Sequence, residues 1–281
     1  MQRFLRRTAW KLRDPPRGVL CLLASHGGLC YTTQTVTLQL ISEAFWPGVR
    51  IPVEEIALEI EAKFILPDEH IFRRLVDVDE LGGLRLSTAQ VKQVRDRYVD
   101  TAQGAFLRGG YACRLRAVGD VRLVTLKSIA VADDAVHRRE EVEVRLTPTQ
   151  ASGPVDLWPA SEATDFARHF CAGQPLELLF ELQQERHVRL ATRRGEDQPV
   201  IEVSVDHVCF SDDSVCQVYE LEAELLPAGR LADLTPLTVE LIEQWALLPQ
   251  AMSKFERGLA LCCPELSLVL AAQRNSPRSL A

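Results

Sequence analysis

The sequence lacks the cysteine spacing of a metal-binding or disulfide-stabilised protein. Its eight cysteines include no C-x-x-C pair, and they form neither a zinc-ligand pattern nor a compact disulfide framework. Reduced, buried thiols are typical of a cytosolic protein. Long hydrophobic runs are missing too, because residues 18–29 are interrupted by Ser25 and His26 and fall short of the roughly 20 residues that a membrane span requires. We therefore expect a cytoplasmic protein without membrane contact.

An excess of positive charge is also missing. The chain has 32 Lys and Arg residues against 39 Asp and Glu residues, a formal net charge of −7. This balance argues against nucleic acid as the main partner, although a local basic patch can still bind a small polyanion. Neither Gly82-Gly83 nor Gly109-Gly110 has the setting of a nucleotide-binding loop, and we expect both to be turns. Nothing indicates a Ser–His–Asp triad.

The first 50 residues differ from the rest of the chain. Six of the first 17 residues are basic and only Asp14 is acidic, which is typical of a transit peptide. We favour a poorly ordered leader over a targeting signal; a genuine signal would imply import into an organelle. The expected organisation is a leader at 1–50, a folded domain at 51–265 and a C-terminal tail at 266–281, since 281 residues fit one large domain.

Charged and apolar residues alternate at strand period in residues 58–64. Glu59, Glu61 and Lys63 share one face, and the residues between them are apolar. One such segment indicates no more than a solvated strand face. The pattern returns at 219–225 and 141–145, however, and aligned carboxylates repel one another unless cations are present. We therefore expect strands turned toward a shared polar interior that holds metal ions and an anion.

Hydrophobic periodicity and turn residues predict the other elements. The expected strands are 52–66, 91–101, 111–117, 121–129, 137–146, 176–186, 187–192, 200–207 and 215–225. The expected helices are 68–76, 161–170, 234–248 and 253–261. Many short strands with few helices predict an α+β, mainly β fold: a closed antiparallel eight-stranded β-barrel with peripheral helices.

An E-x-E-x-K sequence at 59–63 is followed by further charged strand motifs in a fixed order. They are R-Y-V-D-T at 97–101, R-x-R at 114–116, T-L-K at 125–127, R-E-E-V-E at 139–143, E-R-H-V at 185–188, V-D at 205–206, E-L-E-A-E at 220–224 and S-K-F at 253–255. This ordered set resembles the CYTH, or triphosphate tunnel metalloenzyme, superfamily over about residues 53–260. The resemblance implies a barrel whose lumen binds a triphosphate.

The resemblance also implies roles for individual residues. Metal ligands would be Glu59, Glu61, Glu222 and Glu224, with Glu141, Glu143, Asp206 and Glu220 in a second tier. Substrate would be bound by Lys63, Arg114, Arg116, Lys127, Arg186 and Lys254, and catalysis would rest on Glu59, Glu61, Lys63 and Arg116. Clustered carboxylates suit Mg²⁺ or Mn²⁺, and guanidinium forks suit phosphate oxygens. The implied activity is metal-dependent triphosphate hydrolysis, with tripolyphosphate as the default substrate.

Several of these assignments have alternatives. An outward-facing position on the barrel is the alternative for Arg114, Arg116 and Lys127. For Lys254 the alternative is an ordinary surface position. Asp206 is expected to orient an arginine by hydrogen bonding. Arg189, Arg193 and Arg194 are expected to form a solvated face. Within the family, a class IV adenylyl cyclase acting on ATP or a thiamine triphosphatase, with Trp158 as an aromatic shelf, is the alternative activity. Outside it, the alternative is a noncatalytic polyphosphate- or nucleotide-binding module.

Overall fold

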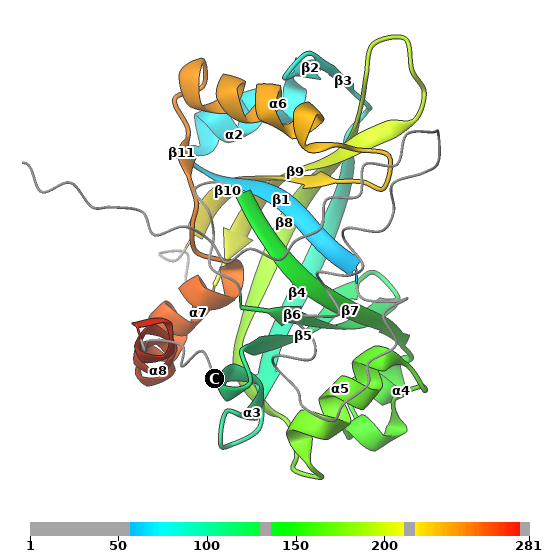
Figure 1. The fold of residues 1–281 in the computed structure, drawn as a ribbon, viewed down its shortest axis with the longest axis vertical. Helices are drawn as coiled ribbons and strands as arrows, with labels where there is room; N and C mark the ends of the chain where they lie inside the picture. Colours follow the sequence, from blue (N-terminus) through cyan, green and yellow to red (C-terminus); the bar gives the residue numbers. More distant parts are fainter. Residues whose placement is uncertain (1–56, 130–135, 211–216, 276–281) are drawn as a thin grey trace, which may run out of the picture. The chain divides into compact units, whose positions relative to one another are not determined.

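Eight antiparallel strands close into a barrel, as the sequence predicts (Figure 1). The computed structural model describes residues 57–129, 136–210 and 217–275; the expected leader at 1–50 lies outside this range. Around the barrel the strand order is β8-β4-β5-β6-β7-β1-β10-β9, and pairing of β8 with β9 closes it. The strands are β1 (Ala57–Leu66), β4 (Gln90–Asp100), β5 (Tyr111–Val118), β6 (Val121–Ser128), β7 (Val136–Leu146), β8 (Glu177–Thr192), β9 (Pro199–Cys209) and β10 (Gln217–Leu225).

Short strands and helices are added to this barrel. The added strands are β2 (Glu80–Leu81), β3 (Leu84–Leu86) and β11 (Leu248–Pro249). The helices are α2 (Glu69–Asp77), α3 (Ala105–Arg108), α4 (Pro148–Ala151), the 3₁₀ turn η1 (Val155–Leu157), α5 (Glu162–Cys171), α6 (Leu231–Glu243), α7 (Lys254–Cys262) and α8 (Pro264–Asn275). Among the described residues, no helix has both the length and the apolar content needed to cross a membrane.

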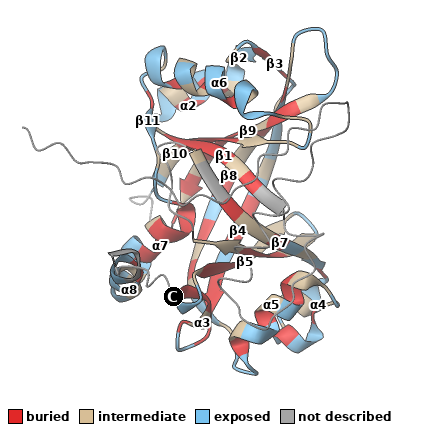
Figure 2. Cartoon of the chain, in the orientation of Figure 1, coloured by how far each residue is buried: buried red, intermediate tan, exposed pale blue. Residues whose placement is uncertain are grey.

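One large hydrophobic cluster lies outside the barrel, between its strands and the helices α2 and α6. On β1, Ala62 and Phe64 have no exposed surface and pack in one cluster with Leu75 of α2 and Leu237 of α6. Figure 2 shows that buried residues continue along the strands and onto α7. Because side chains alternate between the two faces of a strand, the residues between these apolar ones point into the lumen. The outer core therefore fixes which charged residues face inward.

Two element predictions were wrong in detail. Residues 177–192 form the single strand β8 rather than two strands, since the Arg186–His187 junction carries no turn residue. The helix predicted at 234–248 is α6, which begins at Leu231 and ends at Glu243. Ala246 follows with a φ of 53°, a left-handed conformation that cannot continue the helix, and Leu248 then belongs to β11.

Arg189 does not belong to a solvated face. Its side chain is buried and donates hydrogen bonds to the backbone oxygens of Ser87, Val76 and Val78. This buried guanidinium anchors the segment after α2 to the outside of β8. The predicted tail at 266–281 begins inside α8, whose Leu270 packs in one cluster with Phe255 of α7.

Candidate functional site

The acidic and basic strands face each other across the lumen. In the antiparallel pairing of β1 with β10, Glu61 lies opposite Glu224 and Lys63 lies opposite Glu222. β5, which carries Arg114 and Arg116, is four steps from β10 in either direction around the barrel. The lumen therefore has an acidic wall, made by β1 and β10, and a basic wall centred on β5.

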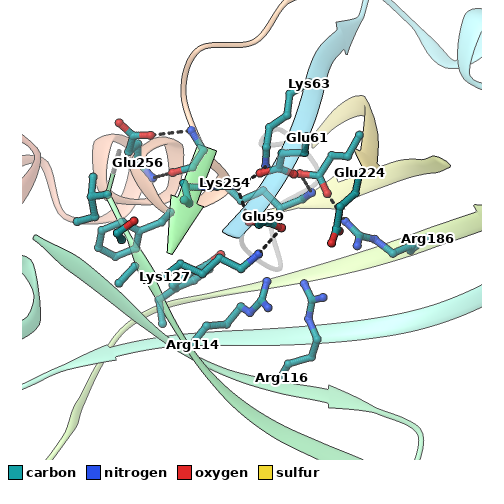
Figure 3. Close-up of a pocket in the computed structure, with 18 of the residues that line it drawn as sticks. Glu59, Glu61, Lys63, Arg114, Arg116, Lys127, Arg186, Glu224, Lys254 and Glu256 are labelled. Atoms are coloured by element: carbon teal, nitrogen blue, oxygen red, sulfur yellow. Dashed lines mark hydrogen bonds and ion pairs between the residues drawn. The ribbon is translucent and has the colours of Figure 1, made fainter. Parts of the chain in front are cut away.

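One cavity of about 160 Å³ lies between these walls. Ten of the fourteen predicted site residues line it: Glu59, Glu61, Lys63, Arg114, Arg116, Lys127, Arg186, Glu222, Glu224 and Lys254. Figure 3 labels nine of these side chains, all except Glu222, and shows them converging from separate strands and from α7. Outward placement of Arg114, Arg116 and Lys127, and surface placement of Lys254, are thereby excluded.

Most of the acids and bases in the lumen pair with one another. Lys63 Nζ lies 2.6 Å from Glu222 Oε1 and 3.1 Å from Glu61 Oε1. Lys127 Nζ lies 2.8 Å from both Glu59 Oε1 and Glu141 Oε2. Many charges buried in one space are tolerated because each is paired with an opposite charge.

Arg114 is the exception among these bases. Its side chain is buried, yet no carboxylate of the described residues forms an ion pair with it. Its Nη2 donates a 3.1 Å hydrogen bond to the hydroxyl of Thr125, and its Nε has no partner. Asp96, Glu141 and Glu143 act on Arg114 from a distance and outweigh its burial, so its pKa is raised. The basic wall thus carries a charged guanidinium with an unused donor that faces the cavity.

The four second-tier residues support other side chains instead of lining the cavity. Asp206 binds Arg186 through both carboxylate oxygens, which confirms the expectation that it orients an arginine. Glu141 pairs with Lys127, and Glu220 pairs with Lys254. Glu143 is exposed and accepts a hydrogen bond of 2.7 Å from Thr125.

Lys254 enters the lumen from the first turn of α7. Ser253 and Glu256 form a capping box that fixes where this helix begins. Lys254 Nζ then lies 3.0 Å from both Asp206 Oδ2 and Glu222 Oε1. The next residue, Phe255, packs on Tyr98 with ring centroids 5.3 Å apart, so α7 contributes a charge and an apolar contact to the cavity.

Three residues in or beside the lumen were not predicted. Arg139 lies close to Glu61 and 3.5 Å from Glu59, Glu202 lines the cavity, and Asp96 binds Arg116. Strand parity would have found two of them. Arg139 shares the face of Glu141, and Glu202 shares the face of Asp206.

Burial and neighbouring charges shift the pKa values of the lumen residues in opposite directions. Burial disfavours the ionised form of Glu59, but Lys127 and Arg139 outweigh it and lower the pKa of its carboxyl group to about 2. Burial, together with the charge of Glu59, raises the pKa of Glu224 to about 7. The pKa of Lys127 is raised because Glu59 and Glu141 outweigh its burial. Glu224 is thus a lumen carboxylate whose negative charge is not fully offset by neighbouring cations.

The donor set fits a divalent cation chemically. Glu59 Oε2 and Glu61 Oε1 are buried and accept no hydrogen bond, although Arg139 lies close to both. Glu224 and Glu202, direct partners on β10 and β9, add carboxylates on the same wall. Hard divalent cations such as Mg²⁺ prefer oxygen ligands of this kind. Within the described ranges, no three His, Cys, Asp or Glu side chains already converge at metal-binding distance.

Trp158 does not lie at the site. It is buried beside α4, donates its indole N–H to the carbonyl of Gln150 at 3.1 Å, and is not among the residues that line the cavity. The aromatic shelf suggested for a thiamine group is therefore wrong for this residue.

Comparison with known proteins gives one family and several similar folds. The family model described as the CYTH domain matches residues 57–251. A candidate adenylyl cyclase from Hippeastrum, described as having a dominant triphosphatase activity, is 18% identical, with 74% of this chain and 98% of that chain covered and a TM-score of 0.58. A candidate adenylate cyclase from Bacillus halodurans is 20% identical, with 72% and 97% covered and a TM-score of 0.50. No curated protein sequence matches this chain closely enough to count as a relative.

Proposed function

Because this chain belongs to the CYTH domain family, we propose that it is an enzyme that hydrolyses a triphosphate inside the barrel, with tripolyphosphate as the default substrate. The observation that carries the proposal is the guanidinium of Arg114, which is buried at the cavity without a carboxylate in direct contact among the described residues. Its Nε donor has no partner, and a phosphate oxygen would satisfy it. Six further basic side chains line the same cavity and indicate that the anion has several negative charges: Lys63, Arg116, Lys127, Arg139, Arg186 and Lys254.

The basic side chains would bind and position the phosphate groups. Arginine offers a planar fork that matches two phosphate oxygens, whereas lysine acts as a point charge. Arg114 and Arg116 extend from alternate positions of β5, roughly 6.6 Å apart along the strand. They can therefore contact neighbouring phosphate groups of one chain, while Lys63, Lys127, Arg186 and Lys254 contact the remaining oxygens.

Glu59, Glu61, Glu222 and Glu224 would hold Mg²⁺ or Mn²⁺. A divalent cation held there would neutralise part of the phosphate charge and would make a water a better nucleophile. Lys63 and Lys127 now pair with these same carboxylates, so the bases and acids must exchange partners when substrate and cation arrive. Before binding, these ion pairs therefore keep the acidic and the basic side chains of the lumen ionised although they are buried.

Hydrolysis requires attack of water on the terminal phosphorus. Negative charge then builds on the equatorial and leaving oxygens, and fixed cations that meet this charge lower the barrier. We assign this charge stabilisation to the cationic side chains of Lys63 and Arg116, which extend from opposite walls. Glu59 and Glu61 would hold the divalent cation. No side chain has to form a covalent intermediate.

A product assay tests the proposal. Purified protein is incubated with tripolyphosphate, ATP or thiamine triphosphate in the presence of Mg²⁺ or Mn²⁺, and phosphate and cyclic AMP are measured. Phosphate release from tripolyphosphate that stops on addition of EDTA is the expected result. Cyclic AMP from ATP would identify a cyclase instead, and tight binding without any product would identify a noncatalytic module.

A further inference from the structure

Asp96 on β4 is a buried carboxylate with no exposed surface, and no sequence motif singled it out. It lies directly opposite Arg116 in the pairing of β4 with β5. Arg116 Nε and Nη2 donate to Asp96 Oδ1 and Oδ2, each at 2.7 Å, which is a two-bond fork. Gln184 on β8 donates a further hydrogen bond of 2.8 Å to Oδ2. Asp96 is thus fixed from two neighbouring strands.

The two arginines of β5 differ in this respect. Arg116 and Arg114 line the same cavity, and Figure 3 shows their side chains directed into the same space. Among the described residues, Arg114 donates a hydrogen bond only to the neutral hydroxyl of Thr125 and is influenced by Asp96 from a distance, while Arg116 is held by Asp96 directly. Arg114 therefore keeps an unused donor for an anion. Arg116 offers an orientation that is already set and a charge that is partly neutralised.

We infer that Asp96 is a positioning residue that fixes Arg116 for catalysis and limits how tightly Arg116 binds phosphate. The inference rests on the proposed function for the identity of the anion as a triphosphate. Without Asp96, the half-buried guanidinium of Arg116 would lack its paired carboxylate until phosphate arrived, so the anion would bind more tightly. The side chain would also be free to follow the phosphate, and its alignment with the developing charge would be lost.

The charge-removing variant Asp96→Asn tests this inference. We expect about tenfold tighter binding of tripolyphosphate in EDTA, measured by titration calorimetry, and about a tenfold lower kcat with Mg²⁺ or Mn²⁺. Inhibition by pyrophosphate should also occur at lower concentrations. A residue with a merely structural role would reduce the amount of active protein and leave Kd unchanged.

Asp233→Asn is the matched control. Asp233 also binds an arginine through both oxygens, since Arg193 Nε and Nη2 each donate to it at 2.8 Å, but this pair joins the segment after β8 to α6 and does not line the cavity. We expect this variant to keep the wild-type Kd and kcat. Equal Kd values for Asp96→Asn and Asp233→Asn would overturn the inference.

Arg116→Lys provides a second route if Asp96→Asn does not fold. Lysine keeps the charge next to Asp96 but cannot form the two-bond fork. We expect kcat to fall at least tenfold while Kd stays within about threefold of wild type; an unchanged kcat would overturn the inference. Because Kd is measured in EDTA, a protein that binds tripolyphosphate without hydrolysing it would refute the proposed function and still test Asp96.

Discussion

Glu224 on β10 lies directly opposite Glu61 on β1, so two carboxylates face each other across one antiparallel pair. Directly opposed like charges destabilise a sheet. Lys63 and Arg139 lie next to Glu61, whereas the pKa of Glu224 is raised to about 7 by burial and by the charge of Glu59. A cation bound at this pair would reduce the repulsion between the two carboxylates.

The first prediction concerns the stability of the metal-free protein. The pKa of Glu224 rises from 4.5 to about 7 on folding, so between these values the folded state binds more protons than the unfolded state. The contribution of Glu224 to the free energy of unfolding is therefore fully present below about pH 4.5, is lost as pH rises toward 7, and is constant above. Urea unfolding in EDTA from pH 4.5 to 8 measures it.

Glu224→Gln isolates this contribution, because glutamine cannot ionise. We expect this variant to lose the part of the pH dependence that lies between about 4.5 and 7, and to be more stable than wild type at pH 8 in EDTA. Glu243→Gln, an exposed residue at the end of α6, is the control and should keep the wild-type profile. Identical profiles for Glu224→Gln and wild type would rule out a shifted carboxyl group at this position.

The second prediction concerns Glu59. Glu59→Gln removes a negative charge from the acidic wall, and we expect kcat with Mg²⁺ or Mn²⁺ to fall more than about 100-fold, beyond the effect of outer-shell changes at metal sites. Phosphate release from tripolyphosphate measures it, with circular dichroism to confirm folding. Glu69→Gln on α2, whose partner is the exposed Arg73, should keep full activity. Full activity of Glu59→Gln would remove this residue from the metal site.

The third prediction concerns binding and stability at Arg114. Arg114→Met keeps the length of the side chain and removes its charge, so kcat/KM should fall by about 100-fold, equivalent to about 2.7 kcal/mol. The urea midpoint of the free protein should decrease, because Asp96, Glu141 and Glu143 stabilise this charge by more than its burial destabilises it. An unchanged or higher midpoint would show that these carboxylates do not stabilise Arg114 in the folded protein.

The fourth prediction concerns the packing of α7. A Cβ atom at Gly258 would lie 2.0 Å from Cε2 of Phe180, whose ring stacks on Tyr98 at 4.8 Å between centroids. Gly258→Ala should lower the free energy of unfolding by roughly 1–3 kcal/mol, and it should raise KM because α7 carries Lys254. Leu261→Ala, on an exposed position of the same helix, should change neither quantity. An unchanged KM would show that the contribution of Lys254 to substrate binding does not depend on how closely α7 packs against Phe180.

The barrel could be predicted because strand alternation is a local property, whereas the individual site residues followed from the ordered motifs that resemble the CYTH family. Glu59, Glu61 and Lys63 are separated by apolar residues, and the same alternation on β10 places Glu222 and Glu224 on one face. The barrel follows from many such strands with short connections. The strand boundary placed between Arg186 and His187 failed because no local signal shows whether a strand continues beyond a barrel.

Sequence alone determined which residues of each strand share a face, because side chains alternate in direction along a strand. Only the tertiary structure decided how the charges are shared, since that depends on which strands become neighbours. Asp96 pairs with Arg116, and Arg114 contacts the hydroxyl of Thr125 instead of a carboxylate, because β4, β5 and β6 are adjacent and in a particular register. Ion pairs form over a few ångströms between residues that are far apart in the chain, so the spacing of residues along the sequence does not show which of them pair.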